Sequence, residues 1–360
     1  MANPSPQRTP WWTWAWPLFA WLMIAMSAIA GAGGLIAAID ALALVATVFA
    51  AVYHAEVVAH RIGEPFGTLV LAVAVTVIEV ALIVAVMLAA PAENAALARD
   101  AVFAAVMIAS NGIVGLSLLL GGARHHEQAF QLEGASAALA VLAALTILTL
   151  VLPNFVASAP GPVFTTGQLI FAGVVSLVLY GAFVFVQTVR HRDYFLSTDP
   201  KSEHAETPSD RMALISAGLL LICLIAVVGL AKTLTPAVES GIRAADAPKA
   251  VVGVIIAALV LLPEGLAALR AAHANRLQVS LNLALGSALA SIGLTIPVVA
   301  AVSIGLGQPL ELGLNEKDLV LLALTLLVGI LTLGTGRTTV LQGVVHLVIF
   351  AAFLFFAIVP

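Results

Sequence analysis

Long apolar runs alternate with short polar stretches along almost the entire chain. The runs predict eleven membrane-spanning helices, at residues 15–32, 35–59, 67–90, 100–120, 135–152, 166–188, 212–231, 250–271, 281–303, 319–334 and 339–358. Each run is close to the roughly 20 residues that a helix needs to cross a bilayer. Because none shows the period-two alternation of a membrane β-strand, the pattern predicts an all-α polytopic membrane protein rather than a barrel.

The first run has the length of a secretory signal peptide, which would open with basic residues. Instead it opens with Trp11, Trp12, Trp14 and Trp16, aromatic residues that favour a membrane–water interface. We therefore expect a retained first helix.

The distribution of lysine and arginine predicts the orientation of the chain. With the N-terminus in the cytoplasm, ten basic residues fall in inside segments and five in outside segments. The inside set is Arg8, Arg61, Arg124, Arg190, Arg192, Lys201, Arg211, Arg270, Arg276 and Arg337. The outside set is Arg99, Lys232, Arg243, Lys249 and Lys317. The positive-inside rule thus predicts a cytoplasmic N-terminus and an external C-terminus.

The longest polar stretch divides the chain into unequal parts. We expect an extra N-terminal helix at 1–34, a first five-helix repeat at 35–189, a cytoplasmic loop at 190–211 and a second five-helix repeat at 212–360. Because five is odd, the second repeat would insert upside down relative to the first. This inverted repeat is typical of secondary transporters, which place their substrate site near the membrane midplane.

Two features recur at the same ordinal place in the two halves. The third and eighth spans each carry one glutamate about a dozen residues after a glycine, and the sixth and eleventh spans each open with Thr-Gly. These are Gly67 with Glu79, Gly253 with Glu264, Thr166-Gly167 and Thr335-Gly336.

Composition narrows the class of protein further. Charged residues make up 9 % of the chain and apolar residues 62 %, and the mean hydropathy is +1.11. Soluble domains carry about 25 % charged residues, so this chain is not a water-soluble enzyme. The basic residues lie mostly in short loops, which argues against nucleic-acid binding. The single cysteine, Cys223, excludes an intrachain disulfide and is interpreted as a small buried apolar residue.

Glu79 and Glu264 are the main candidates for function. An ionised carboxylate in the membrane interior is unfavourable unless it meets a partner, and such acids are functional by default. The alternative is a carboxyl that stays protonated or pairs with a distant helix. Glu264 follows Pro263 and precedes Gly265, so we expect a kinked or broken helix whose freed carbonyls suit a hard cation. Two acids match one divalent cation or two protons, because two like charges cannot both stay ionised in an empty buried site.

Hydroxyl and amide side chains supply further candidate cation ligands. Thr76 lies one turn before Glu79, and Ser287 and Ser291 share a face of the ninth span with Thr295. The fourth span adds Ser110 and Asn111. For each of these residues, interhelical hydrogen bonding is an equally good interpretation.

Three residues are candidates for a proton path: Glu56, His60 and His346. Glu56 and His60 are four residues apart near the cytoplasmic end of the second span and could form a pair, or simply cap a helix end. His346 lies within the eleventh span, where an intramembrane histidine relays protons or packs against polar neighbours.

Several motifs are absent from the sequence. There is no phosphate-binding loop, no Gly-x-Ser-x-Gly, no His-Glu-x-x-His and no cysteine cluster. We therefore expect no enzyme activity, no ATP drive within the chain and no cofactor. The expected partners are transported cations, protons and membrane lipid, and the oligomeric state stays open. A passive cation channel and an intramembrane enzyme remain alternatives.

Specific residues resemble the calcium/proton exchangers of the Ca2+/cation antiporter superfamily. In the first half they are Ala55-x-Glu56-x-x-Ala59-x-Arg61-x-Gly63-Glu64-x-x-Gly67, then Glu79. In the second they are Val238-Glu239, Gly253, Glu264 and Gly286-Ser287. The set Gly63-Glu64-Pro65-x-Gly67, Leu262-Pro263-Glu264-Gly265, Thr295-x-Pro297-Val298-Val299 and Thr335-Gly336-Arg337-Thr338 with His346 is most similar to the bacterial ChaA type.

This resemblance implies a function and a location. It implies a secondary antiporter of the bacterial inner membrane that exports Ca2+, or also Na+ or K+, in exchange for protons. It also implies that Glu79 and Glu264 bind the cation and the protons. The family's Gly-Asn pair before each glutamate is replaced here by Val75-Thr76 and Val260-Leu261, which leaves the ion preference open.

Overall fold

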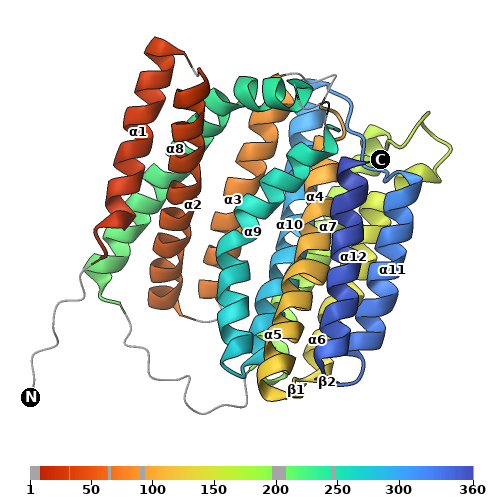
Figure 1. Ribbon diagram of the computed structural model, residues 1–360. Coiled ribbons are helices and arrows are strands. Elements are labelled where there is room, and N and C mark those ends of the chain that lie inside the picture. The colour runs from red at the N-terminus through yellow and green to blue at the C-terminus, as the bar shows by residue number, and fades with distance from the viewer. Residues whose placement is uncertain are drawn as a thin grey trace, which may run out of the picture. The chain divides into compact units, whose positions relative to one another are not determined.

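The computed structural model describes residues 9–31, 33–63, 66–89, 94–196, 208–244, 246 and 248–359. Within them nearly every residue is helical, and the helical segments form eleven rods (Figure 1). The elements are α1 Trp12–Ala30, α2 Gly34–Ile62, α3 Phe66–Ala89, α4 Leu97–Met107, η1 Ile108–Ile113, α5 Val114–His125, β1 Gln128–Ala129, α6 Leu132–Thr146, η2 Ile147–Val151, η3 Leu152–Asn154, α7 Thr166–Phe185, η4 Val186–Arg190, η5 Arg192–Tyr194, α8 Asp210–Ala244, α9 Ala250–His273, α10 Leu277–Leu306, α11 Glu316–Leu333, β2 Arg337–Thr338 and α12 Val340–Ile358. The predicted all-α polytopic fold is confirmed.

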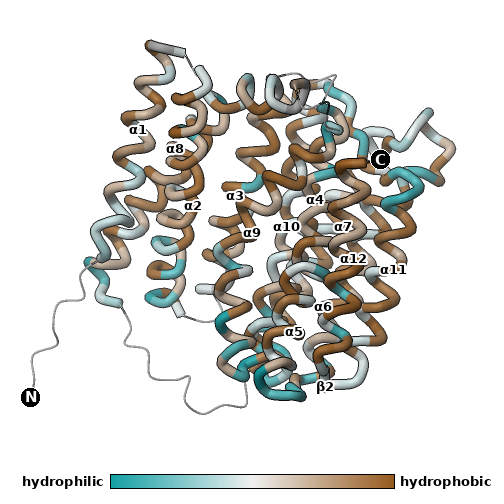
Figure 2. Tube along the Cα trace, in the orientation of Figure 1, coloured by the Kyte–Doolittle hydropathy of each residue, from teal (hydrophilic) through white to brown (hydrophobic). Residues whose placement is uncertain are grey.

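The helices have the length and composition of membrane spans. Ten of the described helical segments are long and apolar enough to cross a bilayer. The tenth predicted span, at 319–334, corresponds to α11, which is not among them because it opens with the charged residues Glu316, Lys317 and Asp318. Figure 2 shows hydrophobic residues along most of the helix bodies and hydrophilic residues gathered at their ends. This distribution is expected where lipid is the solvent around the helices.

The chain forms two compact units. Unit 1 comprises Met1–Val86 and Ser202–Gly241, and unit 2 comprises Met87–Lys201 and Ile242–Pro360. Each unit therefore contains segments of both predicted repeats. Parts of the sequence motifs lie outside the described residues, namely Arg8, Glu64, Pro65 and positions 197–207 of the predicted cytoplasmic loop.

Unit 1 contains α1, α2 and most of α3 and α8. Arg61 at the end of α2 forms an ion pair with Asp210 at the start of α8. At the start of α3 the backbone N–H of Gly67 donates to the carbonyl of Gly63 at 2.8 Å. A Cβ on Gly67 would collide with the backbone carbonyl of Ala59. Glycine is therefore required at the start of α3, where the sequence resembles the exchangers.

Unit 2 packs its remaining helices through small residues. The pairs α4 with α9, α5 with α12, and α7 with α10 lie against one another. A Cβ on Gly253 of α9 would lie 2.7 Å from the backbone of Asp100 and Ala101 in α4. A Cβ on Gly122 of α5 would lie 2.7 Å from the backbone nitrogen of Val340 in α12. Small residues at such positions let backbones approach closely, which drives helix association in lipid.

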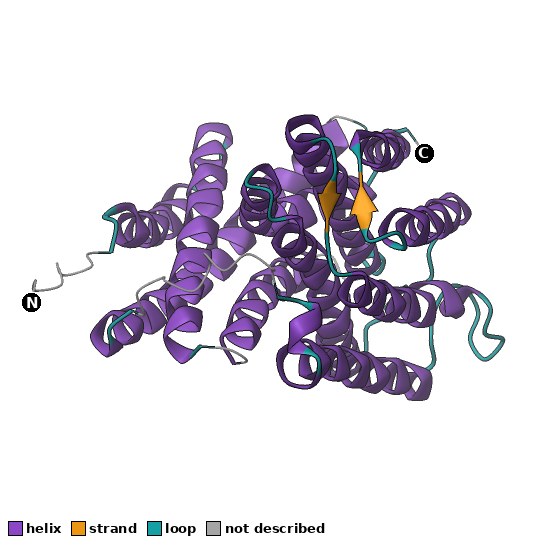
Figure 3. Cartoon of the chain, turned by 90° about the horizontal axis from the view of Figure 1, so that it is seen from below, coloured by secondary structure: helices purple, strands orange, loops and turns teal. Residues whose placement is uncertain are grey.

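Several connections between helices lie at one end of unit 2. The strands β1 and β2 pair antiparallel there, with Gln128 opposite Thr338 (Figure 3). At the same end the guanidinium of Arg124 lies 3.2 Å from His273 Nε2, and Gln278 Nε2 donates to the carbonyl of Tyr194 at 3.4 Å. The predicted inside segments around residues 124–131, 192–196, 270–278 and 334–339 thus share one end, as the predicted alternation of spans requires.

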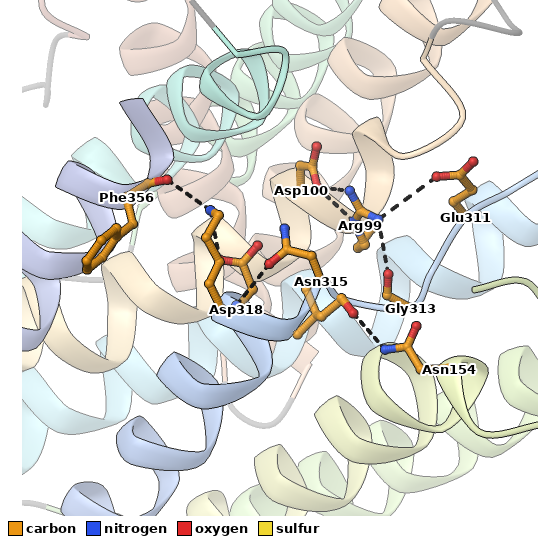
Figure 4. Close-up of polar contacts among 10 residues, drawn as sticks. Arg99, Asp100, Asn154, Glu311, Gly313, Asn315, Asp318 and Phe356 are labelled. Atoms are coloured by element: carbon orange, nitrogen blue, oxygen red, sulfur yellow. Dashed lines mark hydrogen bonds and ion pairs between the residues drawn. The ribbon is translucent and has the colours of Figure 1, made fainter. Parts of the chain in front are cut away.

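A cluster of polar residues connects helix ends and loops at the opposite end of unit 2 (Figure 4). Arg99 Nη2 pairs with Asp100 at 2.8 Å, and its Nη1 donates to the carbonyl of Gly313 at 3.0 Å. Asn315 caps α11 by accepting the backbone N–H of Asp318 at 3.0 Å. Lys317 Nζ donates to the carbonyl of Phe356 at 2.9 Å. These bonds satisfy helix ends that would otherwise leave backbone groups unpaired.

The sixth and eleventh rods begin with the same local structure. Thr165 and Gln168 form a reciprocal capping box at the start of α7, and Thr339 and Gln342 form another at the start of α12. The expectation that the eleventh span opens at Thr335-Gly336 is wrong, because this dipeptide precedes β2 and the helix begins five residues after Thr335. Arg337 and Thr338, which precede this helix, instead form β2 and pair with β1.

Gly253 offers a test of the close helix packing. We expect Gly253→Val to lower the stability of the protein by about 1–3 kcal/mol, because the side chain would displace the α4 backbone. Thermal unfolding followed by size-exclusion chromatography in detergent measures this effect. Gly181→Ala in α7 is the matched control, since a Cβ there meets nothing within 4 Å. Equal behaviour of the two variants would contradict the packing described.

Candidate ion-binding residues of the two units

Glu79 lies in the middle of α3, in unit 1. It is preceded by thirteen helical residues and followed by ten. Its side chain is 1 % exposed, and Thr76, one turn earlier on the same face, is 6 % exposed. The predicted carboxyl and hydroxyl are therefore both enclosed in protein. Apolar residues on both sides of Glu79 in α3 leave no charged neighbour within the helix itself.

Glu264 lies in α9, in unit 2, and is 7 % exposed. The sequence predicts a kinked or broken helix at Pro263; the helix is not broken there, because α9 is continuous from Ala250 to His273. Proline lacks an N–H, so the carbonyl of Leu259 loses its ordinary helical donor. Neighbouring helices tolerate such a residue inside a membrane helix. Gly265 next to Glu264 allows Ile113 of η1 to pack closely, since a Cβ there would lie 3.2 Å from Ile113 Cδ1.

The fourth rod contains a feature that the sequence pattern does not reveal. Residues Ile108–Ile113 form a π-helical turn, η1, between α4 and α5. Such bulges widen a helix by one residue and often occur at functional sites. Ser110 and Asn111 both lie in this turn and are buried. The hydroxyl of Ser110 has no hydrogen-bond partner within the described structure.

Asn111 belongs to a directed chain of hydrogen bonds. Its Nδ2 donates to Thr325 Oγ1 at 2.9 Å, so its Oδ1 accepts from His346 Nδ1 at 3.0 Å. The neutral imidazole then accepts at Nε2 from the hydroxyl of Thr332, 3.1 Å away. The hydroxyl of Thr325 in turn donates a hydrogen bond to the carbonyl of Leu321 at 2.7 Å. This chain ties η1 to α11 and α12.

This chain of hydrogen bonds changes the interpretation of Asn111, predicted as a cation ligand, and of His346, predicted for a proton path. Both atoms of the Asn111 amide are engaged within unit 2, and His346 is 1 % exposed with both ring nitrogens engaged. Thr325 and Thr332 were not among the predicted site residues, although each is a lone hydroxyl in an apolar run of α11. Such a residue needs a partner inside the protein.

The ninth rod, α10, carries hydroxyl groups and packs against α9, the helix of Glu264. Helices α9 and α10 and the turn η1 pack against one another. Ser291 and Thr295 are buried and Ser287 is half-buried. The hydroxyl of Thr295 has no hydrogen-bond partner within the described structure. One carboxyl and several hydroxyls thus line adjacent elements of unit 2, and oxygen is the ligand atom that hard cations prefer.

The remaining proton-path candidates differ in their surroundings. Glu56 and His60 are exposed near the end of α2, and His60 Nδ1 lies 2.8 Å from the backbone carbonyl of Glu56. Glu56 and His60 belong to unit 1 and His346 to unit 2. Within the described residues there is no group of three or more histidine, cysteine or acidic side chains that could hold a resident metal ion.

The fold and these buried acids are typical of a secondary transporter in the membrane. Comparison with known proteins identifies the class more narrowly. The family profile of the sodium/calcium exchanger proteins matches residues 18–189 and 215–359. The chain belongs to this family and is a cation antiporter.

Individual relatives cover almost the whole chain. It is 53 % identical to y4hA of Sinorhizobium fredii, an ionic transporter by name, over 98 % of this chain and 97 % of that protein. It is 38 % identical to the sodium-potassium/proton antiporter ChaA of Escherichia coli, over 88 % of both chains. Among solved structures, the H+/Ca2+ exchanger CAX superposes with a TM-score of 0.74 at 14 % identity, over 95 % of this chain and 86 % of that one. At that identity the likeness concerns the fold alone.

The directed hydrogen-bond chain predicts a measurable coupling. We expect Asn111→Leu and His346→Leu each to lower the unfolding free energy by about 1–3 kcal/mol, because each leaves a buried partner unsatisfied. The double variant should lose less than the sum, with a coupling of roughly 0.5–1.5 kcal/mol. Unfolding in mixed micelles measures both quantities.

The control for this cycle pairs His346→Leu with Ser176→Ala. The Ser176 hydroxyl bonds the carbonyl of Ala172 in its own helix, so it shares no partner with His346. These two changes should add within about 0.5 kcal/mol. Additivity of the Asn111 and His346 variants would contradict the hydrogen-bond chain.

Proposed function

We propose that the protein exports a cation from the bacterial cytoplasm in exchange for protons, with Glu79 and Glu264 as the acids that bind both. The observation that carries this proposal is that each compact unit contains one buried glutamate in an apolar helix. Their exposed fractions are 1 % and 7 %. Lysine, arginine and histidine are absent from α3, and in α9 they occur only in its last turn.

The exchange follows from the chemistry of two buried acids. With a cation bound, both carboxylates are ionised and their charge is balanced. When the cation leaves, two like charges in a medium of low dielectric are unstable, and protons replace it. Cation and protons therefore compete for the same oxygens and cross in opposite directions. An inverted repeat, which the division of the family match on either side of residues 190–214 supports, would expose these oxygens to each side in turn.

The ligand chemistry favours hard cations. Glu79 with Thr76, and Glu264 with Ser287, Ser291 and Ser110, offer only oxygen atoms, which suit Ca2+ and Na+. The name of ChaA in Escherichia coli specifies sodium, potassium and protons, and that of CAX specifies calcium and protons. We propose that Ca2+ and the alkali cations Na+ and K+ compete for these two acids. Asn111 contributes by holding the turn η1 in place through its hydrogen bonds to Thr325 and His346.

Proton movement requires groups besides the two glutamates. His346 can take a proton at Nε2 if the Thr332 hydroxyl turns to accept from it, since hydroxyls both donate and accept. Glu56 and His60, exposed near the end of α2, are suited to exchange protons with the solution. The positive-inside rule places this end in the cytoplasm, with the C-terminus on the outer side of the inner membrane.

Proteoliposomes with an imposed pH gradient test the function directly. Ca2+, Na+, K+ and Mg2+ are added in turn while a fluorescent dye reports the internal pH. We expect cation-dependent collapse of the gradient, and accumulation of the transported cation against its own gradient. A passive channel would equilibrate the cation without uphill accumulation. No collapse with any of these ions, from folded protein, would refute proton-coupled exchange.

The two glutamates provide the sharpest variants. We expect Glu79→Gln and Glu264→Gln each to reduce exchange to the background of protein-free liposomes, because the amide cannot balance a cation or exchange a proton. Glu316→Gln, at the exposed start of α11, should retain wild-type exchange. Retained transport in both single variants, with normal elution on size exclusion, would refute the assignment of these acids.

A further inference from the structure

A line of polar residues runs along the buried face of α2 in unit 1. Asp40, Thr47 and His54 follow one another at intervals of seven residues, and each is 0 % exposed. Seven residues make two helical turns, so the three side chains share one face. Asp40 was not among the predicted site residues, although a lone acid in an apolar run is a sufficient signal.

The facing helix α1 supplies partners in antiparallel register (Figure 1). At one end of the pair, His54 Nε2 donates to the carbonyl of Thr13 at 3.0 Å. At the other end, the hydroxyl of Ser27 donates to Asp40 Oδ2 at 2.6 Å. These bonds explain how α1 is fixed against α2, and for His54 that explanation is sufficient.

The packing of α1 against α2 does not by itself explain why residue 40 is an aspartate. Besides Ser27, its only other hydrogen-bond partner among the described residues is the hydroxyl of Thr233 in α8, 3.5 Å from Oδ2. That hydroxyl also donates to the carbonyl of Leu230 at 2.9 Å. The second carboxyl oxygen, Oδ1, is buried and has no hydrogen-bond partner within the described structure. An asparagine would hold the two helices together equally well without introducing a charge.

No described cation neutralises Asp40. Helix α1 contains no acidic, basic or histidine residue. On α8 the nearest charged residue is Lys232, which is exposed and forms no ion pair with Asp40 among the described contacts. On α2 the next titratable groups are Tyr53 and His54, about 20 Å further along the helix. A lasting negative charge here would be unfavourable.

A proton fits this position better than a metal ion. Asp40, Ser27 and Thr233 offer four oxygens, whereas Ca2+ takes six to eight. The Ser27 hydroxyl lies directly against the carboxylate, so a metal ion would have to displace it. A proton needs only one lone pair, and Oδ1 presents one.

We propose that Asp40 is a proton-binding carboxyl in the α1–α2–α8 bundle, distinct from Glu79 and Glu264, with Ser27 and Thr233 as its hydroxyl partners. A hydronium ion gives its proton to Oδ1 and leaves as water, and the carboxylate becomes a neutral acid. Asp40 lies six residues, about 9 Å, from the start of α2, whereas Glu79 lies about 20 Å into α3. The proposal does not depend on which cation the protein transports.

Infrared difference spectroscopy of the full-length protein in liposomes tests the proposal without a transport assay. On acidification we expect the carbonyl stretch of a protonated carboxyl to appear in wild type and in the Glu79→Gln/Glu264→Gln variant, and its Asp40 component to vanish in Asp40→Asn. Ser27→Ala should shift this component to higher frequency, because the hydroxyl that bonds it is lost. Thr47→Val is the matched control and should leave it unchanged.

Three results would overturn the proposal. The first is an acidification spectrum that is identical in wild type and Asp40→Asn. The second is loss of the Asp40 component when Na+ is added at fixed pH, which would assign a metal ion to the site. If Asp40→Asn does not fold, Asp40→Glu replaces it and should move the component. The third result is then a spectrum that neither Asp40→Glu nor Ser27→Ala alters.

Discussion

Lipid offers no hydrogen bonds, and this constraint governs the structure at every level. Backbone groups satisfy it by forming helices over nearly all the described residues. Side chains must satisfy it by meeting partners across helix interfaces. The chain from Thr332 through His346 and Asn111 to Thr325 does so by giving each donor one acceptor. Because the partners come from three separate segments, the same bonds also fix how those segments pack.

Close packing is the second consequence of a lipid solvent. Apolar surface gains little by leaving one hydrocarbon environment for another, so helices associate through close contact between backbones. Gly67 beside Ala59, and Gly253 beside Asp100, are positions where a methyl group has no room. Each glycine precedes a buried glutamate in its helix by about a dozen residues. The close contacts therefore fix the helices that carry Glu79 and Glu264.

Acidic side chains are exceptions to the apolar composition of these helices, and where they lie indicates their function. Asp100 and Asp318 lie at a helix end, where Arg99 and Lys317 neutralise them. Glu79, Glu264 and Asp40 are instead buried within apolar helices. For the two glutamates this supports exchange between a cation and protons. For Asp40, the two neighbouring hydroxyls and the carboxyl oxygen Oδ1, which has no hydrogen-bond partner within the described structure, support binding of a proton and not of a metal ion.

The sequence by itself determined the number, order and approximate limits of the helices, because length and hydropathy suffice when lipid is the solvent. It also indicated the family and the two glutamates, since an acid in an apolar run is conspicuous without any tertiary information. It could not determine that Ser110 and Asn111 lie in a π-helical turn, or that α9 continues through Pro263. Nor could it show that Asp40 meets Ser27 and Thr233. These features depend on which helix faces meet, and no local pattern encodes a contact between residues that are far apart in the chain.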